Sequence, residues 1–227
     1  LPAVQRRVVE ALKTAGKRIV FVNFSGAAIA LEPESLNCEA ILQAWYPGQA
    51  GGQAVAEVLF GDYNPAGKLP LTFYRNLAQI PDFEDYNMTG RTYRYMKETP
   101  LFPFGHGLSY TTFKYGKLKM NDDKIAVGQN LNLVIPVTNT GSRDGDEVVQ
   151  VYLKKMDDTE GPVKTLRAFK RVRIPAGKTV EVKFSLDDTQ LEWWDEQSNT
   201  MRVCPGNYTV MIGGTSCEKS LLSRAFT

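Results

Sequence analysis

Ser25 is the first residue of this chain whose position suggests chemistry, because Ser25-Gly26 directly follows a short apolar run. A nucleophilic serine needs a neighbouring base, and the only histidine of the chain is His106. The Gly-x-Ser-x-Gly pattern of a strained strand-to-helix turn is absent, so the sequence does not predict a serine nucleophile. If the apolar run is a parallel strand, Ser25 lies at its carboxyl end, where α/β proteins bind ligands. Ser25 is therefore a candidate ligand contact, with turning of the backbone as the alternative.

Three acids stand close together at Asp82, Glu84 and Asp85, a spacing that could supply a carboxylate pair for acid/base chemistry. Their polar surroundings favour solvated loop residues instead. Arg91 and Tyr93, a few residues further on, are better candidates for ligand binding. A guanidinium and a phenol can hydrogen-bond ligand hydroxyls. The alternative for both is packing against a neighbouring domain.

Glycines at 48, 51 and 52 stand where a strand is expected to meet a helix, as in phosphate-binding loops. The G-x-G-x-x-G spacing and the Walker lysine are both missing. The pattern therefore predicts a tight turn followed by a helix start.

Trp193-Trp194 could form an aromatic binding platform. Adjacent residues of a strand point to opposite faces of the sheet. We therefore expect one of the two rings to fill the core and at most one to be exposed.

The composition argues against several function classes. The 27 basic and 25 acidic residues leave a formal charge of +2, and the basic residues are scattered, so nucleic acid is not an expected partner. No uncharged apolar run approaches the roughly 20 residues of a membrane span. A single histidine makes a metal cluster improbable, and we expect no metal and no cofactor. The three cysteines form no CxxC pair and are expected to be free thiols.

The elements expected to position these residues change in character along the chain. Residues 1–74 alternate helical and strand patterns: an apolar stripe over 4–15, runs at 19–22 and 40–46, a helical pattern from 51 to 59, and a last possible strand at 69–73. Such alternation favours parallel strands joined by helices. About three strands is few for a whole sheet of this kind, so the segment is interpreted as the second half of an α/β domain.

Residues 75–112 hold many aromatic residues, prolines and glycines without a sustained period. We expect an ordered strap packed on a surface, because large rings are unusual in a flexible linker. The prediction places Phe102, Phe104 and Tyr110 in buried positions. It leaves Tyr93 exposed.

From residue 113 to 227 the apolar period becomes two, and turn signals separate about seven short strands. This pattern predicts an antiparallel β-sandwich of the immunoglobulin or fibronectin type III kind. The predicted fold is thus α/β followed by all-β.

Two long motifs identify a family resemblance. The first is W-Y-P-G-Q-A-G-G at 45–52, continued by V-L-F-G-D-Y-N-P-A-G-K-L-P-L-T at 58–72, and the second is P-F-G-H-G-L-S-Y-T-T-F at 103–113. A weaker set comprises L-R-A-F-K-R-V at 166–172, P-G-N-Y at 205–208, and Gly213. In this order and spacing they resemble family 3 glycoside hydrolases over nearly the whole chain.

The resemblance implies a parent with an N-terminal (β/α)8 barrel, an α/β sandwich domain and a fibronectin type III-like domain. Such enzymes remove a terminal β-linked sugar with retention, using one carboxylate as nucleophile and one as acid/base. In the family the nucleophile is a barrel Asp, and the acid/base of many members is a Glu just ahead of the Leu-Pro found here at residues 1–2. No residue of this chain maps onto either, so we expect no catalytic residue here and no activity of the chain alone.

The detailed sequence of two motifs suggests which branch of the family the chain resembles. Residues 90–95 and 46–52 are more similar to the β-xylosidase branch than to β-glucosidases. A β-xylosidase acting on xylo-oligosaccharides is expected, with a β-glucosidase or a stand-alone carbohydrate- or protein-binding module as alternatives. The expected partners of the parent are a β-linked oligosaccharide and the barrel domain, with Arg91, Tyr93 and Ser25 as candidate substrate contacts. A secreted or periplasmic location is expected for the parent.

Overall fold

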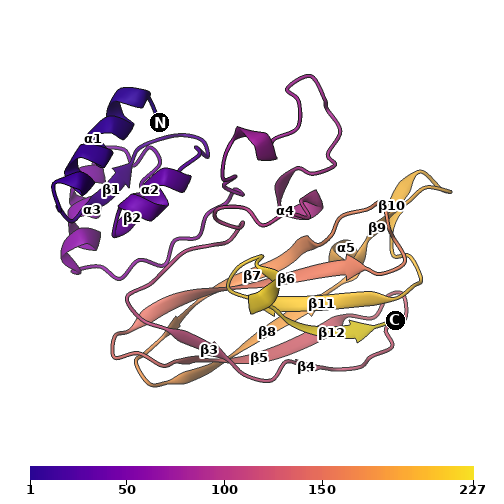
Figure 1. The fold of residues 1–227 in the computed structure, drawn as a ribbon. Coiled ribbons are helices and arrows are strands. Elements are labelled where there is room, and N and C mark those ends of the chain that lie inside the picture. Colours follow the sequence, from indigo (N-terminus) through magenta and orange to yellow (C-terminus); the bar gives the residue numbers. More distant parts are fainter.

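The structure is a computed structural model that describes all 227 residues. An α/β portion and a β-sandwich lie beside each other, and residues 61–112 run between them (Figure 1). This order of elements confirms the predicted fold class.

The α/β portion comprises α1 (Ala3–Thr14), β1 (Val20–Asn23), α2 (Glu32–Asn37), β2 (Ala40–Gln43) and α3 (Gly51–Phe60). β1 and β2 pair in parallel. Helix α2 was not expected, because six residues are too short for a helical period to show. Its start is favoured by a proline in the first turn and by two acids near the helix N-terminus.

The strand expected at 69–73 does not form, and that prediction is wrong. Only Phe73 forms an isolated antiparallel bridge, with Phe102. The Phe73 amide donates to the Phe102 carbonyl at 2.9 Å. Pro70 has no amide hydrogen to give to a ladder, and the neighbouring chain here is the strap rather than β1 or β2. The parallel sheet therefore has two strands.

The apolar stripe predicted on the first helix exists but is not covered by this chain. Val4, Val8 and Leu12 of α1 are 60%, 56% and 41% exposed. The helix is held from its other side, where the Arg6 guanidinium pairs with the buried Glu34 carboxylate at 2.9 Å. The face that an amphipathic helix normally turns to a core is therefore open.

The sandwich consists of two four-stranded antiparallel sheets. One contains β3 (Phe113–Tyr115), β4 (Lys119–Met120), β5 (Leu131–Asn139) and β8 (Thr179–Leu186). The other contains β6 (Gly145–Lys155), β7 (Thr165–Ile174), β11 (Tyr208–Gly213) and β12 (Leu222–Phe226). A hairpin of β9 (Trp193–Asp195) and β10 (Thr200–Arg202) follows the short helix α5 (Asp188–Leu191) at one end.

The core lies between these sheets and follows the predicted period of two. On β5, Leu131, Leu133, Ile135 and Val137 are all buried, and their neighbours are more exposed. β6 departs from alternation, because residues 149–153 are buried in succession. Its second face is covered by the strap, so both faces of this strand are shielded from water.

The strap includes the 3-10 turn η1 (Leu77–Gln79) and helix α4 (Thr92–Tyr95). Its ring burial differs from the prediction. Tyr93 is half-buried and stacks on Phe104 at 4.4 Å between ring centroids, whereas Tyr110 is 46% exposed. Phe83 and Tyr86 are the outward-facing rings instead. Phe102 and Phe104 are partly buried. The prediction was wrong for Tyr93, because its ring packs on β6 of the sandwich next to Tyr152, and for Tyr110, whose hydroxyl donates to the Val58 carbonyl while much of its ring stays in solvent.

Candidate functional site

A polar cluster lies at the carboxyl ends of β1 and β2. Asn23 donates to Ser25 Oγ at 2.8 Å and to Gln43 Oε1 at 2.6 Å. Gln43 Nε2 approaches Ser25 Oγ at 3.3 Å, and Ser25 Oγ donates to the Ala27 carbonyl at 2.9 Å. The serine hydroxyl thus gives its only proton to the backbone and accepts from two amides. Ser25 can stabilise the loop that follows β1, but no base is placed to activate its hydroxyl as a nucleophile.

Two aromatic residues stand beside this cluster. Trp45 has a left-handed backbone (φ 54°), which costs energy for a non-glycine residue, and its ring meets Phe73 edge to face at 6.2 Å. Tyr46 is exposed, and its ring lies over Gly26 so closely that a Cβ there would come within 2.5 Å of it. Backbone strain, aromatic faces and planar amides therefore meet at the strand ends. Sequence reasoning missed both rings as site residues, although they lie two and three residues after the end of β2.

Arg91 organises its own loop. Its guanidinium donates to the carbonyls of Asn87 at 3.0 Å, Asp82 at 3.0 Å and Asp85 at 2.5 Å. These contacts fold residues 82–91 back on themselves. They support a positioning role, and sugar contact by Arg91 stays a prediction.

Tyr93 accepts a hydrogen bond from the Leu166 amide at 3.2 Å through its hydroxyl. Its ring lies between Phe104 and Tyr152. Tyr93 thus fastens the strap to β6 and β7, while Ser25 lies in the α/β portion. The structure does not gather the three candidate residues at one point, and substrate contact by them stays a prediction.

Asp85 of the strap is unsuited to proton donation. The Asn87 amide donates to Asp85 at 2.9 Å, and this hydrogen bond lowers the pKa of the Asp85 carboxyl. A general acid in glycoside hydrolysis needs the opposite shift. Asp82 accepts a hydrogen bond from the backbone amide of Glu84 at 2.9 Å. Both are turn-forming side chains.

The remaining motif residues have structural roles. Gly48 is left-handed (φ 71°) and precedes α3, as expected for a tight turn with a helix start. Trp193 is buried and Trp194 is 51% exposed, which confirms the prediction for that pair. His106 stacks on Phe102 at 5.2 Å. Burial lowers the pKa of His106, and the Lys68 charge lowers it further.

No group of three or more His, Cys, Asp or Glu side chains is arranged to hold a metal ion. The three cysteines are free. None of the helices has the length and hydropathy needed to cross a membrane.

The two long motifs are locked together through Asn64. Its Oδ1 accepts from Ser109 Oγ at 2.8 Å and from the Tyr110 amide at 2.7 Å, and its Nδ2 donates to the Asp144 carbonyl at 2.9 Å. Gly107 packs so closely that a Cβ would come within 2.1 Å of the Gly67 carbonyl oxygen. The motifs are therefore the seam between the α/β portion, the strap and the sandwich.

The chain thus combines two domains, an α/β portion and a fibronectin-like sandwich, which are joined by the strap. Both domains match known protein families. Residues 1–110 match the glycosyl hydrolase family 3 C-terminal domain, and residues 147–216 match the fibronectin type III-like domain. The chain belongs to glycoside hydrolase family 3 and corresponds to the C-terminal portion of its members.

Its relatives are β-xylosidases and β-glucosidases. The chain is 53% identical over its whole length to a xylan 1,4-β-xylosidase of Xylanibacter ruminicola, covering 26% of that protein. It is 38% identical over 96% of its length to a periplasmic β-glucosidase of Salmonella typhimurium, covering 30% of it. A β-glucosidase from Listeria innocua solved with glucose matches the whole chain with a TM-score of 0.84 and 29% identity, over 33% of that structure. The chain thus spans about a quarter to a third of the length of these relatives.

Proposed function

We propose that this chain is the C-terminal part of an exo-acting, retaining β-xylosidase that degrades xylo-oligosaccharides. The observation that carries the proposal is the 53% identity, over the entire chain, to the Xylanibacter ruminicola enzyme. A β-glucosidase of the same family is the second candidate, supported by the 38% identity to the Salmonella typhimurium enzyme. That relative also supports a periplasmic or secreted location for the parent.

The chemistry of retention requires two carboxylates about 5–5.5 Å apart, one nucleophile and one acid/base. Three acids of the α/β portion and strap have structural partners: Glu34 pairs with Arg6, Glu32 pairs with Arg75, and Asp85 closes a turn. In the proposed parent the barrel supplies the nucleophile, and the segment preceding Leu1 supplies the acid/base. This chain alone is inactive.

The contribution of the chain is positional. The open stripe of α1 is the surface on which the rest of the α/β domain packs, and the strand-end cluster with Ser25 forms part of the wall of the sugar cleft. Arg91 and Tyr93 hold the strap that presents this wall to the barrel. The sandwich braces the assembly through the Asn64 seam.

The test is a complementation experiment. The chain replaces the corresponding 227-residue segment of the Xylanibacter ruminicola enzyme, and hydrolysis of 4-nitrophenyl β-xyloside is measured. The proposal predicts kcat/KM within about tenfold of the parent, because the catalytic carboxylates are untouched and about half of the C-terminal residues are identical. A folded chimera without xylosidase activity contradicts the proposal.

Sugar preference is tested on the chain joined to the polypeptide that precedes it in its own parent. The expected result is a higher kcat/KM for the β-xyloside than for the β-glucoside. A reversed preference would replace the β-xylosidase with the β-glucosidase proposal.

A further inference from the structure

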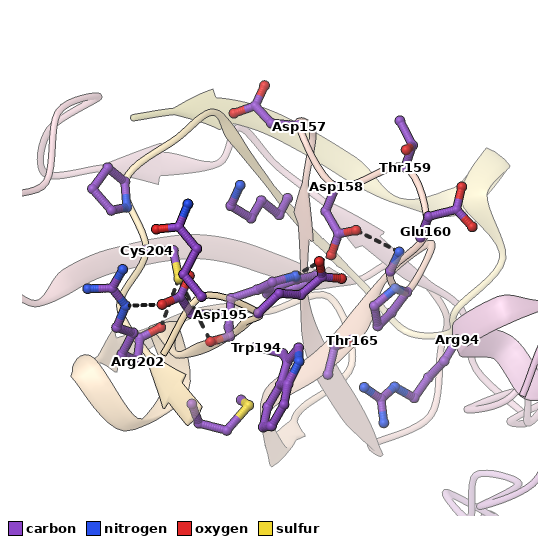
Figure 2. A pocket seen from close by; sticks show the side chains of 18 of the residues that line it. Arg94, Asp157, Asp158, Thr159, Glu160, Thr165, Trp194, Asp195, Arg202 and Cys204 are labelled. Carbon is purple, nitrogen blue, oxygen red and sulfur yellow. Dashed lines mark hydrogen bonds and ion pairs between the residues drawn. The ribbon is translucent and has the colours of Figure 1, made fainter. Parts of the chain in front are cut away.

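A groove lies at one end of the sandwich, where the loop between β6 and β7, the β9–β10 hairpin and α4 of the strap meet (Figure 2). It encloses about 690 Å³. That volume falls within the roughly 300–1,000 Å³ usual for ligand pockets. The groove is built by elements from the strap and from the sandwich, so it exists only when both are in place.

Trp194 gives the groove an aromatic face. Its neighbour Trp193 is buried and anchored, because its indole nitrogen donates to Asp158 at 2.6 Å. Trp194 stands on the same short strand and pairs with Met201 of β10, yet it keeps half of its surface in solvent. The face of an indole ring carries negative partial charge. Such a face suits the weakly positive C–H groups on one side of a pyranose ring.

Two arginines line the groove without a carboxylate partner. Arg94 and Arg167 each have a buried Nε with no hydrogen-bond acceptor. Arg167 donates to the Glu192 carbonyl at 2.6 Å and lies over the Trp193 ring. The Arg94 guanidinium makes no hydrogen bond and lies over the ring of Tyr95, 5.6 Å from its centroid. Burial lowers the pKa of Arg167, and the adjacent Arg94 charge lowers it further.

Unpartnered buried donors cost free energy, so their presence at a groove is informative. The Oγ1 of Thr165, another residue of the lining, is also buried without a partner. Figure 2 shows Arg94 and Thr165 on the same side of the groove as Trp194. The Nε groups of Arg94 and Arg167 and the hydroxyl of Thr165 are thus left without hydrogen bonds within the chain.

The charge balance of the lining selects the kind of ligand. Five acids face four basic residues, and most acids are already engaged, as Asp195 is with Arg202 at 2.8 Å. Glu160 and Glu196 are exceptions, since neither carboxylate has a hydrogen-bond or ion-pair partner in the chain. A polyanion or a polycation would meet like charge at close range. A neutral molecule rich in hydroxyls can use both donors and acceptors.

We propose that this groove binds a neutral β-linked oligosaccharide, with Trp194 stacking on one sugar ring and with Arg94 and Glu160 hydrogen-bonding its hydroxyls. The location of the site rests on the geometry alone. The choice of a xylo-oligosaccharide as ligand rests on the proposed function.

The test is isothermal titration of the 227-residue chain with xylohexaose, and with cellohexaose in parallel. Xylohexaose is expected to bind in the millimolar range or tighter. Trp194→Ala is expected to weaken binding at least about tenfold, because the stacking surface is lost. Phe169→Ala removes another exposed ring, on β7 and outside the groove lining, and should leave binding unchanged.

Arg94→Met is the second variant, because it keeps side-chain length and removes the donors. It should weaken binding severalfold. The unfolding midpoints of the Trp194 and Arg94 variants should stay within about 2 °C of the native chain, which separates lost binding from lost folding.

Failure of both hexasaccharides to bind at 10 mM (on the order of the weakest useful affinity) would overturn the groove proposal and leave the β-xylosidase proposal standing. Equal loss of binding in Trp194→Ala and Phe169→Ala would also overturn it. Cellohexaose binding without xylohexaose binding, lost in Trp194→Ala, would keep the groove and overturn the xylose assignment.

Discussion

Asn64 shows at the residue scale why the family motifs have their composition. A side-chain amide presents an acceptor and donors on one planar group, and Asn64 uses both to join Ser109, Tyr110 and Asp144. An Asp could not donate to the Asp144 carbonyl, and a Gln would place the same group one methylene too far. The Asn-Pro-Ala-Gly motif is therefore a structural clamp.

Asn64→Ala is expected to destabilise the chain by about 2–3 kcal/mol, because three hydrogen bonds of about 1 kcal/mol each are lost. Urea unfolding measures the change. Asn37→Ala is the control, since the Asn37 side chain lies at the end of α2 without a hydrogen bond to the rest of the chain. An Asn64 variant as stable as the control variant would show that the clamp contributes nothing.

His106 makes the stability of the folded chain depend on pH. Its pKa is lowered in the folded chain, so the unfolded chain binds more protons just below the ordinary histidine value of 6.5. Stability from this residue is therefore complete above about pH 6.5 and declines as the pH falls toward the lowered folded value.

His106→Phe keeps a ring for stacking on Phe102 and cannot titrate. Thermal unfolding between pH 7.5 and 5 should show a smaller loss of stability for the variant than for the native chain. Exposed carboxylates with lowered pKa, such as Asp85, add their own loss only at more acidic pH. Parallel pH profiles for the two proteins would contradict the assignment.

At the scale of elements, the two halves of the chain differ in completeness. The sandwich has two four-stranded sheets around a buried core of 18 residues, whereas the α/β portion has two parallel strands and an open apolar stripe on α1. Small two-stranded sheets are marginal without a covering layer.

Residues 113–227 expressed alone should unfold cooperatively, and residues 1–74 alone should be insoluble or lack cooperative unfolding. Far-ultraviolet circular dichroism during urea titration distinguishes the two. The sandwich fragment loses the strap over Tyr152, so its midpoint should lie below that of the whole chain. A stable monomeric 1–74 fragment would be incompatible with this account.

The elements also show where sequence reasoning succeeds. Period two predicted β5 and β8 because one face of each meets the core, and the stripe at residues 4–15 predicted α1. The sequence pattern gave a wrong prediction at 69–73, where the chain pairs with the strap instead of with a strand. It also missed α2, which is too short to show a helical period.

The burial of Tyr93 was predicted wrongly, because the second face of β6 is covered by a segment of the chain more than 50 residues away. Ser25 was proposed as a ligand contact from its place after a strand, and that role stays a prediction, whereas Trp45 became a candidate only through its strained backbone.

At the scale of the whole molecule, a buried ion pair joins the domains. Lys68 contacts Glu147 at 3.3 Å and donates to the Gly107 carbonyl at 3.0 Å, and the Tyr115 hydroxyl donates to Glu147 at 2.9 Å. Burial raises the pKa of Tyr115, and the Glu147 charge raises it further. The α/β end, the strap and both sheets therefore share one hydrogen-bonded network.

Lys68→Met should destabilise the chain by about 3 kcal/mol or more, because it leaves the Glu147 carboxylate buried without its cation. Asp146→Asn is the matched control. It breaks the more exposed pair with Arg171 and should cost less than about 1 kcal/mol. Adding Glu147→Gln to Lys68→Met should restore part of the loss, and a purely additive double variant would argue against a shared network.

The central claim is that this chain carries the positioning part of a β-glycosidase and none of its catalytic carboxylates. The most direct test is hydrolysis of 4-nitrophenyl β-xyloside and β-glucoside by the pure chain. We predict release at the uncatalysed background rate, because a carboxylate pair supplies most of an enhancement of many orders of magnitude. Turnover above background that disappears when an acid of this chain, such as Asp85 or Glu34, is replaced by its amide would contradict the claim.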